Sequence, residues 1–348
     1  MSPVVVREEP LRRFVDEVCA AMGAPADVAA EVAAHLVRAS LSGHDGQGVA
    51  RLPGYAAEAD AGALVPGAVP RVVRETAVVA LFDAGHGFGA YSTAVALAWC
   101  VERARVSGLA AAAVGRSADI GRVGDYGERA AEAGVLAVVT AGTAGRGAGA
   151  TMLQGGRDRF LGGNPWCFAV PGGERSLVAG GATSTVAEAD VRLARARAEQ
   201  LPPDCVLDRY GRPSTDPDDL FAGGGLAPLG GAVAGQVGTG LALASALFGA
   251  LATSREDAGD AAGGVFVQVV DPAAFGEGAG YREVVDRTLA AAAGTRPGAG
   301  RTEVLLPGEL ERRSRVERRR TGVLLPDATW TDLSALADRF GVPPPERG

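Results

Sequence analysis

The stretch SGHDGQGVARLPGY, from Ser42 to Tyr55, has the composition of an active-site loop. It holds a histidine, an arginine and a tyrosine among several glycines, and it follows a long stretch with helical periodicity. Polar side chains on loops between regular elements are disproportionately functional. The segments around this loop therefore decide which fold it serves and which chemistry it supports.

Two amphipathic helices lead into this loop. Apolar residues recur at helical spacing from Leu11 to Met22 and, after Gly23 and Pro25, again from Ala26 to Ala39. A third short helix is expected over 55–62. The N-terminal part of the chain is therefore predicted to be helical.

From residue 70 onward, short β-rich runs alternate with helical patterns, which predicts an α/β fold. The expected strands are 71–76, 77–85, 109–115, 134–142, 167–172 and 264–270, and the expected helices lie near 91–106, 123–133, 186–199, 281–293, 308–319 and 330–340. A glycine-rich loop at 223–240 precedes a buried-looking helix that runs through Ala250, and a polar loop covers 254–264. We divide the chain into an N-terminal helical region packing with the C-terminal helices (1–70), an α/β core with a cofactor-like groove (71–255) and a C-terminal α/β and helical region (256–348).

Charge and composition limit the possible partners. The net charge of −7 argues against nucleic acid, which is bound through basic patches. All 34 basic residues are arginine, because the sequence has no lysine. Pyridoxal phosphate bound to a lysine, other Schiff-base catalysis and Walker-type phosphate binding are thereby excluded.

The four cysteines have neither CxxC spacing nor histidine partners nearby, so no metal site is expected and they are predicted to be core residues in a reducing compartment. The N-terminus shows no signal-peptide pattern, and the longest apolar run, GTGLALASALFGALA, is short and rich in glycine. We therefore expect a cytoplasmic protein that does not interact with a membrane.

The segment Gly85 to Ala90, GHGFGA, matches the dinucleotide fingerprint GxGxxG/A. That fingerprint also needs an acidic residue at the end of the following strand, where this chain has Arg116. An arginine would suit a 2′-phosphate, but a tight strand-to-helix turn explains the glycines more simply. His86 is then a turn histidine, and His35 is interpreted as an ordinary helix residue.

Several motifs occur together in a fixed order. They are SGHDGQGVARLPGY (42–55), GRSADIGRVGDYG (115–127), LGGNPWCFAVP (161–171), GGATSTVA (180–187), LDRYGRPSTDP (207–217), APLGGAVAGQVGTGLAL (227–243) and LLPGE (305–309). In this order and spacing, the chain resembles the malate/L-lactate dehydrogenase family of non-Rossmann type, whose members include ureidoglycolate dehydrogenases, 2,3-diketogulonate reductases and piperideine-2-carboxylate reductases. The resemblance implies a mixed central sheet with N- and C-terminal helical parts around it.

The same resemblance implies a homodimer with its pocket near the subunit interface. It also implies NAD(P)H in a groove, and hydride transfer to or from a 2-oxo acid or cyclic 2-imino acid. The family loop reads roughly GxDSHGVxR, with its histidine as acid and base. Gln47 occupies that position here, and an amide does not shuttle protons near neutral pH.

Other positions that carry protons or positive charge in the family are also replaced. Asp119 stands for the histidine of NSxHxG, Gly180 for the aspartate of DMATS, and Gln236-Val237 for the basic pair of HKG. Backbone-shaping segments survive, which is the pattern of a retained scaffold with changed chemistry. NAD(P)H is possible, but its binding is weakened unless arginines such as Arg116 or Arg122 compensate.

We assign candidate roles from these positions. Asp119, Arg51 and His44 are the candidate catalytic residues, because a carboxylate that meets Arg51 or His44 across the pocket can handle protons. A salt bridge or an ordinary loop histidine is the structural alternative, and Arg51 is also placed to bind a substrate carboxylate. The candidate substrate-binding residues are Gln47, Tyr55, Ser117 and Asn164, and the candidate cofactor-binding residues are Thr183, Ser184, Arg116 and Gln236.

Three functional hypotheses follow, in decreasing order of weight. The first is a biosynthetic enzyme acting on a small carboxylated or carbonyl/imine substrate without redox chemistry, of lyase, isomerase or cyclase type. The second is an NAD(P)H-dependent reductase of a 2-oxo acid or cyclic 2-imino acid. The third is a non-catalytic homologue.

Overall fold

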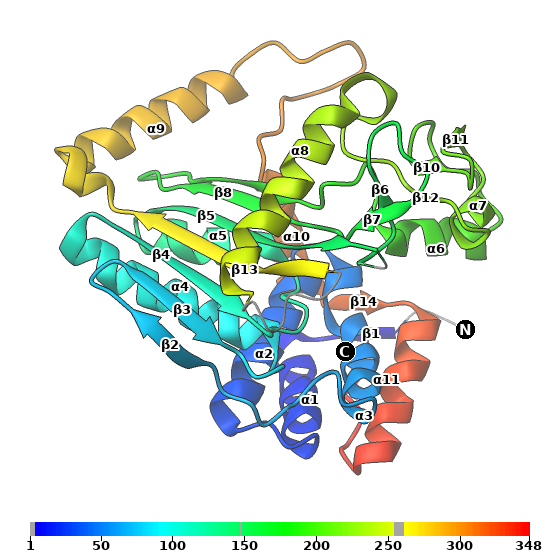
Figure 1. Ribbon diagram of the computed structural model, residues 1–348. Coiled ribbons are helices and arrows are strands. Elements are labelled where there is room, and N and C mark those ends of the chain that lie inside the picture. Colours follow the sequence, from blue (N-terminus) through cyan, green and yellow to red (C-terminus); the bar gives the residue numbers. More distant parts are fainter. Residues whose placement is uncertain (1–3, 147, 254–260) are drawn as a thin grey trace.

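The computed structural model describes residues 4–146, 148–253 and 261–348 (Figure 1). It shows a mixed α/β fold, as predicted, with a large sheet flanked by helices. Most of the predicted polar loop, residues 254–260, lies outside the described residues. The rest of that loop already belongs to a strand, because β13 begins at Ala261.

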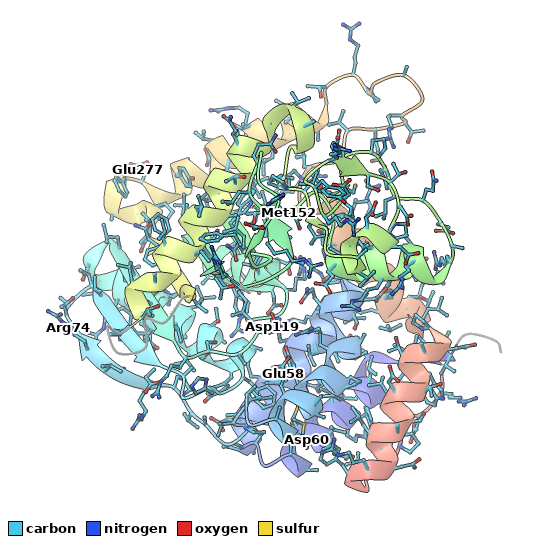
Figure 2. All side chains as sticks on the ribbon, turned by 45° about the vertical axis from the view of Figure 1, so that its right-hand side comes forward. Glu58, Asp60, Arg74, Asp119, Met152 and Glu277 are labelled. Atoms are coloured by element: carbon cyan, nitrogen blue, oxygen red, sulfur yellow. The ribbon has the colours of Figure 1, made fainter. Side chains whose placement is uncertain are left out.

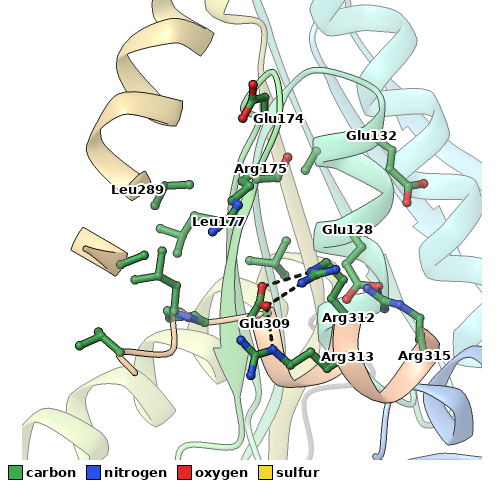
Figure 3. Close-up of a pocket in the computed structure, with 18 of the residues that line it drawn as sticks. Glu128, Glu132, Glu174, Arg175, Leu177, Leu289, Glu309, Arg312, Arg313 and Arg315 are labelled. Carbon is green, nitrogen blue, oxygen red and sulfur yellow. Dashed lines mark hydrogen bonds and ion pairs between the residues drawn. The ribbon is translucent and has the colours of Figure 1, made fainter. Parts of the chain in front are cut away.

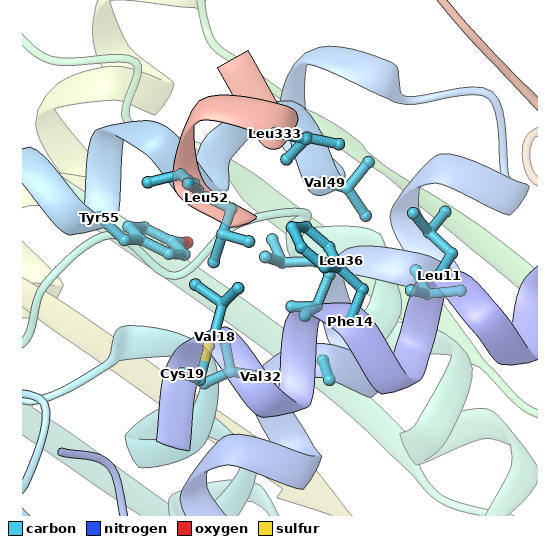
Figure 4. Close-up of a cluster of buried hydrophobic side chains, with 14 of the residues drawn as sticks. Leu11, Phe14, Val18, Cys19, Val32, Leu36, Val49, Leu52, Tyr55 and Leu333 are labelled. Carbon is cyan, nitrogen blue, oxygen red and sulfur yellow. The ribbon is translucent and has the colours of Figure 1, made fainter. Parts of the chain in front are cut away.

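The N-terminal helices form a layer with the end of the chain. Helices α1 (Glu8–Ala21), α2 (Ala26–Leu41) and α3 (Leu52–Asp60) pack with α11 (Asp327–Phe340) around a shared hydrophobic core (Figure 4). Beside them, β1 (Val4–Val6) pairs antiparallel with β14 (Val323–Leu325). The apolar faces of the N-terminal helices thus pack against the apolar face of the C-terminal helix.

The central sheet has twelve strands in the order β11-β10-β12-β6-β7-β5-β13-β4-β3-β2, with β8 pairing β5 and β9. Its longer strands are β2 (Arg71–Glu75), β3 (Val79–Asp83), β4 (Leu109–Gly115), β5 (Leu136–Gly145), β8 (Trp166–Val170), β9 (Leu177–Gly181) and β13 (Ala261–Val270). Its short strands are β6 (Thr151–Met152), β7 (Arg159–Leu161), β10 (Val206–Leu207), β11 (Pro213–Ser214) and β12 (Gly225–Leu226). Strand β13 lies between β4 and β5 and is antiparallel to both.

Helices cover both faces of this sheet. Alternate residues of β13, Val265 and Val267, pack in the core with α4 (Gly89–Ser107) and α5 (Val123–Glu132). The intervening Phe266 contacts Phe248 of α8 (Gly231–Gly249), with ring centroids 5.2 Å apart. Because successive strand residues point to opposite faces, α8 lies on the face away from α4 and α5.

The predicted burial of α8 is wrong for its outer side. Small residues face the sheet, while Val233, Val237 and Leu247 are 98%, 65% and 60% exposed. Residues 231–252 are long and apolar enough to cross a membrane by length and composition alone, and 33% of the most apolar window is buried. The helix is apolar all around because small residues pack on the sheet and larger ones lie outside.

The remaining elements complete the periphery. They are η1 (Asp45–Gln47), η2 (Val49–Arg51), α6 (Glu188–Ala196), α7 (Asp218–Phe221), η3 (Ala250–Ala252), η4 (Pro272–Phe275), α9 (Gly278–Ala293) and α10 (Glu309–Thr321). All four cysteines are free and buried, as predicted. Burial raises the pKa of Cys19, Cys100 and Cys167 to about 12, so these thiols are inert core groups.

Candidate active site

The loop between α2 and α3 is held tightly against α2. A Cβ atom on Gly48 would lie 2.1 Å from Ser40 Oγ, so only glycine fits there. That hydroxyl instead accepts a hydrogen bond from the Val49 N–H at 3.1 Å. The turn therefore fixes where η2 ends and α3 begins, and with it the positions of Arg51 and Tyr55.

Arg51 reaches the loop that follows β4 and pairs with Asp119. The distance from Arg51 Nη2 to Asp119 Oδ2 is 2.9 Å, and the two side chains are 33% and 35% exposed. Two segments that are distant in sequence thus meet through one ion pair. Asp119 does not meet His44.

Two further groups lie beside this ion pair. Glu58 is 3.9 Å from Arg51 Nη2, and the Arg51 guanidinium lies 5.6 Å from the Tyr55 ring centroid. Burial raises the pKa of Tyr55, and the charge of Asp119 raises it further. Burial also raises the pKa of Glu58, while Arg51 opposes that shift. In Figure 2, Glu58 and Asp119 lie near one another where the N-terminal helices meet the sheet.

Glu58 was not among the site residues predicted from the sequence. It lies seven residues after Arg51, which places both side chains on one side of α3, two turns apart. That spacing was the available signal. The Tyr55 hydroxyl is buried beside the Arg51 side chain.

A cavity of about 240 Å³ opens beside Asp119. Its walls come from the loop after β4, from β5, from the segment before β8 and from β13, and the lining residues are Ser117, Ala118, Asp119, Ile120, Ala141, Gly142, Thr143, Gly162, Gly163, Asn164, Pro165, Gly264 and Val265. Asp119 is the one ionisable side chain of that described lining. The structure thus brings together Ser117, Asp119 and Asn164 from the predicted set, with Arg51 and Tyr55 behind Asp119.

The polar groups of Asn164 and Ser117 are engaged with other protein atoms. Asn164 Oδ1 accepts from the Thr143 N–H at 2.9 Å, and its Nδ2 donates to Ala242 O at 2.8 Å. The Ser117 and Ser92 hydroxyls are 3.0 Å apart. Both predicted substrate-binding residues therefore shape the cavity wall in this structure.

His44 and Gln47 lie away from the cavity lining. His44 Nε2 is 3.1 Å from Glu311 Oε1 on α10, and this hydrogen bond lowers the pKa of Glu311 to about 2. Gln47 is exposed at the end of η1. Their predicted roles in catalysis and substrate binding remain predictions, and neither side chain contacts Asp119.

The four candidate cofactor residues are not gathered in one place. The Thr183 and Ser184 hydroxyls donate to the main-chain oxygens of Gly163 and Val186. Gln236 is exposed on the first turns of α8. Gly115, next to Arg116, lies against Ala252. Ala252 follows Gln236 by sixteen residues, which is about 24 Å of helix at 1.5 Å per residue. The predicted set is therefore divided between the two ends of α8.

The glycine motif after β3 is a tight turn, as predicted. His86 has a positive φ of 62°. A Cβ atom on Gly89 would lie 2.2 Å from Ala118 O. This glycine therefore allows the loop after β4, which lines the cavity from Ser117 to Ile120 and is called the cavity loop below, to pack on the start of α4. Asp83 accepts from the Gly85 N–H at 2.9 Å and pairs with Arg116, whose hydrogen bond lowers the pKa of Asp83 to about 2.

His35, expected as an ordinary helix residue, instead holds the cavity loop. It is fully buried, with Nδ1 3.0 Å from Asp125 Oδ2, and Nε2 accepts from the Arg122 N–H at 3.1 Å. A Cβ atom on Gly121 would lie 2.3 Å from that Nε2. The segment after Asp119 is thereby docked onto α2. The helical spacing of His35 gave no sign of these contacts.

A second cavity, of about 370 Å³, lies between α5, β9, α9 and the start of α10 (Figure 3). It is lined in part by the Pro307–Glu309 segment, and three of its arginines, Arg312, Arg313 and Arg315, pair with glutamates. Across the part of the chain that the structure describes, no group of three His, Cys, Asp or Glu side chains is placed to hold a metal ion.

Comparison with known proteins agrees with this architecture. The pattern of the malate/L-lactate dehydrogenase family matches residues 6–334. The chain is 30% identical to L-lactate dehydrogenase of Cupriavidus necator, covering 96% of this chain and 97% of the relative. It is 31% identical to Delta(1)-pyrroline-2-carboxylate reductase of Ancylobacter novellus, covering 95% and 99%.

A solved structure agrees as well. Delta1-piperideine-2-carboxylate reductase from Pseudomonas syringae superposes with a TM-score of 0.80 at 25% identity, covering 96% of this chain and 99% of that chain. Family pattern, full-length relatives and fold all coincide over nearly the whole chain, so the protein belongs to the malate/L-lactate dehydrogenase family.

Proposed function

We propose that the protein is an enzyme that transfers protons within a small carbonyl or imine substrate bound in the 240 Å³ cavity, with lyase, isomerase or cyclase chemistry. The observation that carries this proposal is the Asp119 carboxylate, which lines the cavity and is paired with Arg51 at 2.9 Å. A positioned carboxylate beside a carbonyl or imine removes a proton from the adjacent carbon and returns it elsewhere on the same molecule. Such a reaction needs no external oxidant or reductant.

Arg51 and Tyr55 support that role. Arg51 orients the Asp119 carboxylate through their ion pair, with Nη2 2.9 Å from Oδ2. Tyr55 stays neutral beside Arg51, since burial raises its pKa. Asp119 thus supplies the base at the cavity, and Arg51 and Tyr55 support it from behind.

Family membership implies NAD(P)H, so we ask whether the residues present fit it. Diphosphates are usually held by basic side chains or by free backbone N–H groups at a helix start. The described lining of the cavity contains one carboxylate and no cation, and the start of α4 is covered by the Ala118 and Asp119 carbonyl groups. The 240 Å³ cavity and the start of α4 therefore do not fit a dinucleotide diphosphate, and we assign no step to the nucleotide there.

A second candidate, NAD(P)H-dependent reduction of a 2-oxo acid or cyclic 2-imino acid, is favoured by the names of the full-length relatives, a lactate dehydrogenase and a pyrroline-2-carboxylate reductase. In that case the proton normally supplied by the family histidine comes from another group. A non-catalytic homologue is the third outcome that experiment has to separate.

The test measures proton exchange and nucleotide binding on the same preparation. Small 2-oxo acids and cyclic imines are incubated in D₂O without nucleotide, and deuterium uptake is followed by NMR. We expect enzyme-dependent exchange that falls by about 10²–10⁴-fold in Asp119→Asn. Asp60→Asn, on the exposed end of α3, is the matched control and is expected to exchange like the wild type.

Two results would reject the proposal. One is turnover that appears only with NADH or NADPH, together with calorimetric binding of that nucleotide, which would establish the second candidate. The other is the absence of both exchange and nucleotide-dependent turnover, which would favour the non-catalytic homologue.

We further propose that the enzyme works as a cytoplasmic homodimer with the cavity near the subunit interface. The exposed apolar side of α8 supports the dimer, because this helix packs on β5 and β13, which also line the cavity. The four free cysteines support a reducing compartment.

A further inference from the structure

We infer that His35 is a positioning residue for Asp119, and that it holds the cavity loop in place only while its ring carries a single proton. The inference rests on the proposed function only in taking Asp119 as the group whose position matters for the reaction. It assigns a role to a buried side chain on α2, outside the cavity lining, and makes the position of the loop depend on pH.

The backbone at the end of the cavity loop is anchored by two stacked rings. The Tyr126 hydroxyl donates to Ile120 O at 2.5 Å, and His35 Nε2 accepts from the Arg122 N–H at 3.1 Å. The centroids of the two rings are 5.3 Å apart. Asp119 immediately precedes this anchored stretch, so its place at the cavity is set from α2 and α5.

Asp125 fixes which nitrogen of the His35 ring carries the proton. Its Oδ2 lies 3.0 Å from Nδ1, and Arg38 donates to both of its oxygens, at 2.6 and 2.8 Å. Burial opposes ionisation, but the hydrogen bonds from Arg38 and His35 hold the pKa of Asp125 below its usual range. An ionised carboxylate only accepts hydrogen bonds, so Nδ1 donates and Nε2 is left as the acceptor for the Arg122 N–H.

A second proton on the ring would remove that acceptor. Both ring nitrogens of a charged histidine are donors, so an Nε2–H group would point at the Arg122 N–H. The His35 side chain is fully buried, and neither donor reaches water while the loop stays in place. Buried donors without acceptors are unfavourable, so the loop moves away from a doubly protonated ring.

The charges around His35 balance when its ring is neutral. Two carboxylates and two guanidinium groups of α2 and α5 form one ion-paired network beside it, and these are Glu31, Arg38, Asp125 and Arg129. The other ionisable groups next to the ring are Tyr126, which burial keeps neutral by raising its pKa, and Arg122, whose guanidinium pairs with Glu128. A second proton on His35 therefore adds an uncompensated positive charge to a buried network, which also opposes the loop-bound state.

The first experiment observes the ring and the loop together. The chain has three histidines, so the full-length protein labelled with ¹⁵N-histidine gives ring signals that His44→Ala and His86→Asn assign. We expect the Nδ1–H form of His35 at about pH 8, where histidines are neutral. Hydrogen–deuterium exchange by mass spectrometry, corrected for the unstructured rate at each pH, measures the Arg122 amide. Its protection is expected to be lost over the same pH interval in which the ring takes its second proton, while the protein stays folded.

Two substitutions separate the two nitrogens. An asparagine amide ends at the level of Nδ1, so His35→Asn keeps a donor for Asp125 and removes the acceptor for the Arg122 N–H. A glutamine amide reaches the level of Nε2, so His35→Gln keeps that acceptor and takes no proton near neutral pH. We expect His35→Asn to lose the protection of the Arg122 amide and His35→Gln to retain it at every pH.

Deuterium uptake by the substrate gives the matching functional measurement. It should fall by about 10²-fold in His35→Asn, the order of loss that a displacement of about 1 Å at a reacting group causes. His35→Gln should keep most of the activity and lose the decline that accompanies ring protonation in the wild type. Val28→Ala is the matched control, because this fully buried residue lies two turns earlier on α2. It should lower stability but leave the tautomer and the protection of the Arg122 amide unchanged.

The inference is overturned if His35 carries its single proton on Nε2, if the Arg122 amide stays protected after the second proton binds, or if His35→Asn and His35→Gln lose protection equally. Unfolding of the whole protein before the ring is protonated also counts against it. Failure of the proposed function looks different. A protein whose ring and loop behave as expected, but which shows no proton exchange on any substrate, keeps this role of His35 in holding the loop and loses the proposed reaction.

Discussion

Gly89, at the start of α4, has no side chain and so allows the cavity loop to pack closely on this helix. A Cβ atom there would lie 2.2 Å from Ala118 O and 2.5 Å from Asp119 O, both main-chain oxygens with little room to move. We expect Gly89→Ala to lower the free energy of unfolding by about 1–3 kcal/mol, as overpacking generally does. The change should also displace Asp119 and slow the proton exchange that depends on it.

Urea unfolding and deuterium uptake followed by NMR measure the two effects. Gly54→Ala is the control, because a Cβ atom there meets nothing within 4 Å. A helical glycine without steric conflict gains about 0.4–1 kcal/mol on becoming alanine. Equal effects of the two substitutions would contradict the packing role of Gly89.

The His44–Glu311 contact predicts a specific dependence of stability on pH. Its hydrogen bond lowers the pKa of Glu311 from 4.5 to about 2. A carboxyl group with a lowered pKa in the folded state contributes stability above its ordinary pKa and loses it as pH falls through the lowered value. Wild-type stability should therefore drop by this contribution between pH 4.5 and about 2.

His44→Ala should remove most of that drop, so the stability difference between variant and wild type shrinks as the pH falls from 5 to 2. Urea unfolding at each pH gives the comparison. His86→Asn is the control, since this exposed turn residue has a φ of 62°, a conformation that asparagine tolerates. A constant difference across the whole pH range would show that the His44–Glu311 pair contributes nothing.

At the residue scale, the sequence located the candidate site but did not show which of its side chains lie at the cavity and which point elsewhere. The resemblance placed Arg51, Asp119 and Asn164 on segments that do meet around one cavity. His44, next to these segments in sequence, turns to α10 because Glu311 offers a charged partner there. Such a choice depends on residues far along the chain, which no local pattern reveals.

At the scale of elements, α8 predicts an interaction. Its exposed side carries large apolar residues along the helix, and residues 231–252 contain no charged side chain. We expect the wild type to run at twice 35.1 kDa in size-exclusion chromatography with light scattering. Val237→Glu with Leu247→Glu should shift it toward the monomer, because two carboxylates would be buried in an apolar interface.

Val316→Glu on α10 is the matched control, since that valine is 64% exposed and Val237 is 65% exposed. It should leave the oligomeric state unchanged. A wild type that is already monomeric at micromolar concentration would contradict the dimer and leave the apolar side of α8 without this explanation.

Regular elements with strong periodicity could be predicted from the sequence. The strand at 109–115 has its predicted bounds, and the helix expected at 123–133 spans Val123–Glu132. The pairing of β1 with β14 could not be predicted, because a three-residue strand has almost no periodicity and its partner lies at the other end of the chain. The side of α8 that faces the sheet could not be predicted either, because a helix that is apolar all around shows no polar face in its sequence.

At the scale of the whole molecule, the N-terminal helices depend on the C-terminus for their core. Leu333 of α11 is fully buried in the cluster that contains Leu11, Phe14 and Tyr55 (Figure 4). Leu333→Ala should lower the free energy of unfolding by about 2–5 kcal/mol, the usual cost of a cavity in a core. Leu310→Ala, at a leucine that is 62% exposed, should change it by less than about 0.5 kcal/mol.

Thermal and urea unfolding provide the measurement. Similar small losses in both variants would mean that α11 rests on the N-terminal helices without supporting them. A large loss confined to Leu333→Ala would show that the two ends of the chain unfold as one unit.

The pairing of Val4–Val6 with Val323–Leu325 also bears on how the protein is made in the cell. A ribosome adding about 5–20 residues per second needs roughly 15–60 s between the synthesis of these two strands. During that interval the first helices have emerged without the segment that covers them. Nascent chains of this protein should therefore depend on a chaperone that shields apolar helices until translation ends.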